Sequence, residues 1–129
     1  MCRRPRSVSL FPAPIIVECV QVTRDMLTEA VACIPGFSSY YGFSRRRAGY
    51  SGVATYCRVG CTPVQAEEGL AGISGGGDSI GGTENLRLEF SSEELKNIDA
   101  EGRCVITRHK LDNEGKEQGL VIINVYCPR

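Results

Sequence analysis

The stretch "FSSYYGFSRRRAGYSGVATYCRV", residues 37–59, carries two strand-like runs with a short polar segment between them. Residues 37–43 and 51–59 are rich in aromatic and β-branched side chains, which favour strands. Residues 44–50 supply serine, arginine and glycine, which are typical of a solvent-facing turn. We therefore predict two antiparallel strands joined by a basic turn.

The turn is open to three interpretations. A serine-hydrolase nucleophile elbow requires glycine two positions after the serine, where this chain has Val53. The single histidine, His109, lies in a distant strand-like run, which further disfavours a Ser51–His109 pair. A run of charges is typical of a solvated hairpin tip, whereas cations beside an exposed Tyr50 suit a phosphodiester backbone. The last two interpretations stay open on the residues alone.

Further elements are predicted on both sides of this pair. Residues 15–20 form a short β-branched run, and residues 63–70 indicate a third strand. Apolar residues recur at helical spacing over 23–34, which predicts a helix with Thr23 as its N-cap. The residues at that spacing are Met26, Leu27, Ala30, Val31 and Ile34.

The C-terminal half predicts a helix followed by a hairpin. Ser91 and Glu94 have the spacing of a capping box, which begins a short helix over 91–98. Residues 103–111 and 118–127 flank a segment with turn chemistry, so they indicate a hairpin that ends the chain. A sheet of these strands needs a second layer, and we expect the helices to be too few to supply it.

Composition bounds the class of protein. The 129 residues suit one domain, and 15 acidic side chains balance 15 basic ones, so no overall field favours nucleic acid or membranes. The seven scattered cysteines indicate a reducing compartment. We expect residues 1–14 to be irregular or disordered, and their broken apolar run predicts no membrane span. Arginines and serines without an acidic residue before Glu18 leave a mitochondrial transit peptide open.

Two weak motifs predict no ligand. The glycine-rich residues 72–82 lack the Gly-Lys-Ser/Thr ending of a phosphate-binding loop. Cys57 and Cys61 have no second pair at the spacing of a zinc site, so buried thiols are expected and no metal is assigned.

Four stretches together resemble one enzyme family: residues 22–57, 62–72, 99–110 and 121–129. They are similar to class II apurinic/apyrimidinic endonucleases of the second vertebrate type, in the exonuclease III branch of the endonuclease/exonuclease/phosphatase superfamily. The resemblance implies an α/β fold, a partial four-layer α/β sandwich with mostly antiparallel or mixed sheets. Residues 15–129 would then be an incomplete domain that corresponds to the first half of this fold.

The resemblance also implies a function in DNA base excision repair. The family uses Mg²⁺ to cleave the phosphodiester 5′ to an abasic site, with a 3′–5′ exonuclease side activity. The expected partner is a duplex with an abasic site, and the expected location is the nucleus, with the mitochondrion as the alternative. By the same resemblance Tyr126 is the catalytic tyrosine at the scissile phosphate. The expected DNA-binding residues are Arg45, Arg46, Arg47, Gly49 and Tyr50.

Departures from the family pattern qualify this function. No Asn-Gly-Ile-Arg motif precedes Ile15, and Gln21 runs into Val22 where relatives carry a metal-binding Glu-Thr-Lys. Glu18 is no substitute, because a shift of three residues along a strand reverses the face of the side chain. The Gly-Asp-Leu-Asn and Ser-Asp-His motifs are also absent from the chain. We therefore expect a truncated, catalytically incomplete form that does not hold Mg²⁺. A non-catalytic DNA-binding fragment and a non-functional product are the alternatives.

Overall fold

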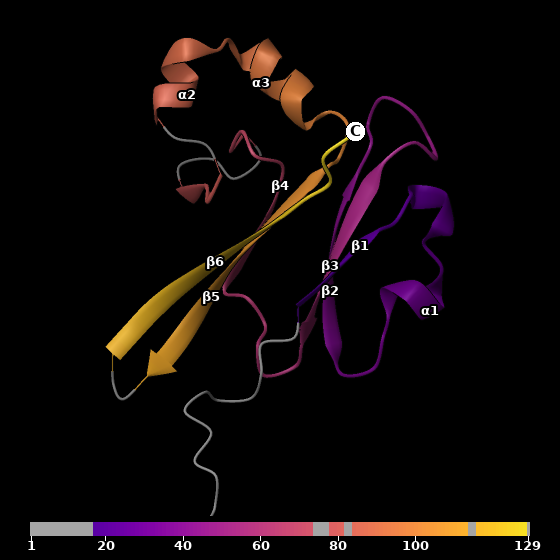
Figure 1. Cartoon of the computed structure of the whole chain (residues 1–129), viewed down its shortest axis with the longest axis vertical. Helices are drawn as coiled ribbons and strands as arrows, with labels where there is room; N and C mark the ends of the chain where they lie inside the picture. Colours follow the sequence, from indigo (N-terminus) through magenta and orange to yellow (C-terminus); the bar gives the residue numbers. More distant parts are fainter. Residues whose placement is uncertain (1–16, 74–77, 82–83, 114–115, 129) are drawn as a thin grey trace, which may run out of the picture.

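A computed structural model of the chain describes residues 17–73, 78–81, 84–113 and 116–128 (Figure 1). The predicted irregular segment, residues 1–14, lies outside this described part. The described helices include none long and apolar enough to cross a bilayer.

The first sheet confirms the strands predicted around the basic turn. It contains β1 (Val17–Gln21), β2 (Phe37–Phe43) and β3 (Gly52–Arg58) in the order β1-β3-β2, with both pairings antiparallel. Phe43 lies opposite Gly52, so residues 44–51 form the connection between β2 and β3.

The single helix predicted over residues 23–34 is wrong. The structure has a 3₁₀ turn η1 (Arg24–Met26) and a separate short helix α1 (Glu29–Ala32). Thr28 is the N-cap of α1: its backbone is extended, and its hydroxyl accepts a hydrogen bond from the Val31 amide at 3.4 Å. The predicted cap, Thr23, makes no such bond. Because an N-cap residue leaves the helical conformation, capping at Thr28 interrupts the expected helix.

The second sheet contains the predicted hairpin. It is built of β4 (Gln65–Glu68), β5 (Cys104–Asn113) and β6 (Lys116–Val125) in the order β4-β5-β6, again antiparallel throughout. Asn113 lies opposite Lys116, and the turn residues between them lie outside the described part of the chain. The predicted third strand therefore exists, but it belongs to a different sheet from β2 and β3.

Two helices precede β5. The capping box at Ser91 and Glu94 is confirmed at the start of α3 (Ser92–Asp99), and the bonds from Ser91 lower the pKa of the Glu94 carboxyl. The sequence did not predict α2 (Glu84–Glu89).

The two sheets pack against each other, with α1 on the outer side of the first sheet and α2 and α3 beside the second (Figure 1). On one side of β3, Ala54 and Tyr56 pack with Val22 and Val31. On the other side, the Asn124 amide of β6 donates to the Ala54 carbonyl and the Thr55 hydroxyl, both at 3.0 Å.

This arrangement agrees with the expected partial four-layer α/β sandwich. It corrects the expectation that the sheet would lack a second layer, because the strands form two sheets that cover each other. The outer side of β6 stays open, where Val121, Ile123 and Val125 are 45%, 55% and 42% exposed.

Candidate nucleic-acid interface

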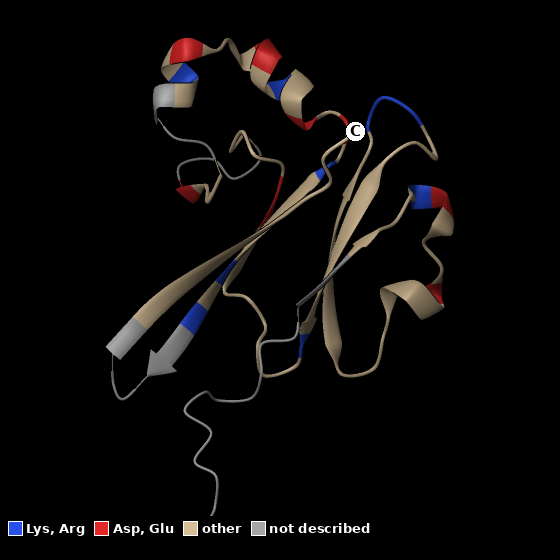
Figure 2. Cartoon of the chain, viewed as in Figure 1, with Lys and Arg blue, Asp and Glu red and all other residues tan. Residues whose placement is uncertain are grey.

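The turn between β2 and β3 presents three exposed arginines, Arg45, Arg46 and Arg47. In Figure 2 this turn is the blue loop beside the C-terminal end of the chain. The Arg45 guanidinium pairs with the Glu68 carboxylate at 2.8 Å, and the Arg46 guanidinium donates to the Asn97 side-chain oxygen at 2.7 Å. These contacts orient two of the arginines while leaving them open to solvent.

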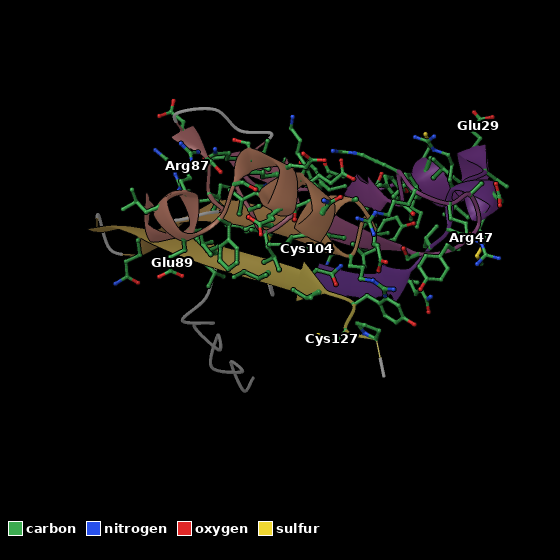
Figure 3. All side chains as sticks on the ribbon, turned by 90° about the horizontal axis from the view of Figure 1, so that it is seen from above. Glu29, Arg47, Arg87, Glu89, Cys104 and Cys127 are labelled. Atoms are coloured by element: carbon green, nitrogen blue, oxygen red, sulfur yellow. The ribbon has the colours of Figure 1, made fainter. Side chains whose placement is uncertain are left out.

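A hollow of about 340 Å³ lies between the turn and η1. Arg24 joins the three turn arginines around it, together with Ser44, Ala48 and Ser51. Sequence reasoning missed Arg24, because the helix predicted around it gave no sign that it would lie next to the turn. Figure 3 shows Arg47 at the end of the molecule opposite to Arg87 of α2.

Gly49 and Tyr50 shape the turn. Gly49 has φ +66°, and a Cβ atom there would lie 2.7 Å from the Asp25 carboxylate, so both conformation and space favour glycine. Tyr50 is 46% exposed, and the Arg47 guanidinium carbon lies 5.7 Å from its ring centre, within range of a cation–π contact.

Arg103 contacts Tyr50 and Tyr126, the two tyrosines that the sequence analysis predicted to be functional. Its guanidinium carbon lies 5.5 Å from the centre of the Tyr50 ring and 5.1 Å from that of Tyr126. The Arg103 Nη2 also donates to the Tyr50 hydroxyl at 3.4 Å. Sequence reasoning missed this residue, since a lone arginine next to a strand carries no local signal.

Glu101 holds the Arg103 guanidinium in place. The Glu101 carboxylate accepts from the Arg103 Nε at 2.5 Å, and this bond raises the pKa of Arg103 above its ordinary value. The Nη1 of the same guanidinium is buried, with no hydrogen-bond acceptor among the described residues. Arg103 is therefore a largely buried charged side chain in contact with two aromatic rings and one carboxylate.

The backbone before β5 ties the turn to the end of β6. The Ser51 hydroxyl donates to the Glu101 carbonyl, and the Tyr126 amide donates to the Arg103 carbonyl at 2.9 Å. Gly102 has φ +60° and packs directly on the Phe43 backbone. Ser51 is buried and its hydroxyl donates to a carbonyl, which agrees with the rejection of a nucleophile elbow on the sequence.

Two carboxylates, those of Glu67 and Asp99, serve as structural hydrogen-bond acceptors. Glu67 accepts from the Ser79 hydroxyl and from the Ile80 and Gly81 amides, at 2.6, 2.6 and 3.2 Å. Asp99 accepts from two further amides, of Leu70 and Ala71. No cluster of three histidine, cysteine or acidic side chains suited to a metal occurs in the described part of the chain. Magnesium is bound by oxygen ligands, and the carboxylate oxygens of Glu67 and Asp99 already accept hydrogen bonds within the chain.

The remaining sequence candidates are part of the packed interior. Cys57 is buried, whereas Cys61 is half-buried. The two nitrogens of the His109 ring contact the Cys61 carbonyl and the Thr107 hydroxyl, each at 2.9 Å. Burial raises the pKa of the Cys104 thiol to about 12, which makes it unreactive at neutral pH.

Known proteins share this sequence and fold, although no protein-family model matches the chain. It is 50% identical over 116 residues to "DNA-(apurinic or apyrimidinic site) endonuclease 2" of Homo sapiens, which covers 87% of this chain and 22% of that protein. The protein of the same name from Bos taurus is 46% identical over 138 residues, which covers 98% of this chain and 27% of that protein.

A solved structure is similar to this chain in both fold and sequence. The crystal structure of the Xenopus laevis APE2 catalytic domain matches with a TM-score of 0.70 and 47% identity, over 88% of this chain and 37% of that chain. The chain spans about a quarter of the length of the curated relatives that it matches. Sequence and fold together show that the chain belongs to the family of apurinic/apyrimidinic endonucleases of the second vertebrate type, and that it matches part of their catalytic domain.

Proposed function

We propose that this chain supplies a surface that binds duplex DNA with an abasic site, in the service of DNA base excision repair. One observation carries the proposal: Arg47, Tyr50, Arg103 and Tyr126 form a contiguous row beside the exposed arginines of the turn. Exposed guanidinium groups neutralise phosphates without reading sequence. An exposed tyrosine ring adds contact with the sugar-phosphate chain.

Within this surface, Tyr126 is the proposed catalytic residue. Its hydroxyl is suited to donate a hydrogen bond to a non-bridging oxygen of the scissile phosphate as negative charge develops there. A lone tyrosine activates no water, and the carboxylates of Glu67 and Asp99 already accept hydrogen bonds from amides or from Ser79, while Glu68 and Glu101 are paired with arginine. We therefore propose that the chain by itself does not bind Mg²⁺ and is catalytically incomplete.

The cellular location is proposed from the family resemblance. We propose the nucleus, with the mitochondrion as the alternative that the basic N-terminal residues leave open. The competing hypothesis is that the chain is a non-functional product, which would show no affinity for DNA.

Two assays on the purified chain test this function. Fluorescence anisotropy with a labelled abasic-site duplex should report weak binding that declines as salt is raised. Incubation of the same duplex with Mg²⁺ should produce no nicking above the protein-free control. Nicking that is lost both with a chelator and in Tyr126→Phe would contradict the proposal that the chain is catalytically incomplete. Absence of binding at low salt would leave the non-functional product as the better account.

A further inference from the structure

Arg103 contacts two side chains that are far apart in the sequence. Tyr50 comes from the turn between β2 and β3, and Tyr126 directly follows β6, yet the guanidinium carbon of Arg103 lies 5.5 and 5.1 Å from their ring centres. The described part of the chain places no other arginine or lysine on both rings.

The surroundings of Arg103 differ from those of a surface arginine. Its side chain is 16% exposed, against 57% for Arg45. The buried Nη1 has no acceptor among the described residues, and the cost of burying such a charge is met in part by the electron-rich faces of aromatic rings. A guanidinium is planar and presents two broad faces and a fork of donors, whereas an ammonium is a compact point charge.

The backbone holds Arg103 where it reaches both rings. Ser51 binds the Glu101 carbonyl, and Tyr126 binds the Arg103 carbonyl. The Arg45 amide donates to the Ala100 carbonyl at 2.8 Å, so the turn and the end of β6 are both fastened to residues 100–103. Residues 100–103 are therefore hydrogen-bonded both to the turn that carries Tyr50 and to Tyr126.

We propose that Arg103 is a positioning residue that holds Tyr50 and Tyr126 in one mutual arrangement, so that a DNA backbone meets both rings together. This inference rests on the proposed function. Arg103 acts through the tyrosines, and it does not itself neutralise a phosphate. A half-exposed ring that lost this contact would sample other rotamers, and binding would have to order it again.

The test uses the full chain with Arg103→Lys, which keeps the charge and removes the planar group. Affinity for the abasic-site duplex is measured by anisotropy over a salt series. We expect affinity to fall about fivefold, as for the loss of one partly desolvated cation–π contact, with an unchanged slope of log affinity against log salt. Arg108→Lys, an exposed arginine of β5 away from both rings, is the matched control and should bind as the wild type does.

Ring resonances give a second readout that separates positioning from general stability. In carbon-13 tyrosine NMR of the free chain, Arg103→Lys should shift the signals of Tyr50 and Tyr126 and leave those of the interior Tyr56 in place. Glu101→Gln keeps Arg103 but weakens the contact between residue 101 and the guanidinium, so it should produce the same shifts at smaller amplitude. Shifts at all the tyrosines would indicate a folding defect and would contradict a positioning role.

Further outcomes also decide the inference. Wild-type affinity and unshifted rings in Arg103→Lys would overturn it while leaving DNA binding intact. If Arg103→Gln lowers the salt slope by about 0.9 while Arg103→Lys binds normally, Arg103 is a direct phosphate ligand and the positioning role is wrong. If the wild type does not bind DNA, the proposed function fails, and the ring signals alone then decide whether Arg103 arranges the two tyrosines.

Discussion

Two kinds of arginine surround Tyr50, and they differ in what they can do. Arg45, Arg46 and Arg47 are exposed on the turn; Arg45 is paired with Glu68, whereas the charges of Arg46 and Arg47 are available to a polyanion and are screened by salt. Arg103 is enclosed by two rings and a carboxylate, so its charge is largely committed within the protein. The difference teaches that the number of arginines in a patch does not measure its capacity to neutralise phosphates.

The largest expected effect is a loss of stability when the backbone next to Arg103 is altered. Gly102→Ala should lower the free energy of unfolding by about 3 kcal/mol, because it combines a left-handed backbone with a methyl group forced into the Phe43 backbone. Urea denaturation followed by circular dichroism measures this loss.

Gly36→Ala is the matched control for that variant. Gly36 has φ +83°, with nothing within 4 Å of a Cβ atom, so the change tests backbone conformation alone. It should cost about 1 kcal/mol, and an equal loss in both variants would mean that the close contact of Gly102 contributes nothing.

The next effect concerns the exposed arginines. Arg46→Ala together with Arg47→Ala should flatten the slope of log affinity against log salt by up to about two units, since each neutralised phosphate contributes about 0.9. Duplex titrations between 50 and 200 mM salt would detect this as about a tenfold smaller loss of affinity than in the wild type. Equal slopes would show that the run is a solvated hairpin tip, and would break the contrast with Arg103.

The smallest effect concerns the ring between the two kinds of arginine. Tyr50→Ala should weaken duplex binding by about 1 kcal/mol through lost ring contact, with a nearly unchanged salt slope. Tyr50→Phe keeps the ring and should bind almost as the wild type does, as the same anisotropy titration can establish. A change of slope in Tyr50→Ala would indicate instead that the ring orients the neighbouring arginines.

Local features of the chain were predictable from its residues. The strand pair around residues 44–51, the capping box at Ser91 and the terminal hairpin depend on contacts between residues close in sequence. The family resemblance likewise came from ordered motifs, and the comparisons bear it out. The prediction of one helix over residues 23–34 was wrong because Thr23 and Thr28 offer the same capping chemistry and the helix begins after the second.

Long-range packing alone decided the rest. The residues themselves did not tell whether β4 would extend the first sheet or join β5, because a period of two specifies a face and not a partner. Nothing near Arg103 indicates that Tyr50 and Tyr126 will lie on its guanidinium, nor that Gly102 must meet the Phe43 backbone. The sequence by itself determined the strands, the basic turn and the family. The tertiary structure decided which arginine is enclosed, because enclosure depends on segments about 50 residues apart that only the packing of two sheets brings together.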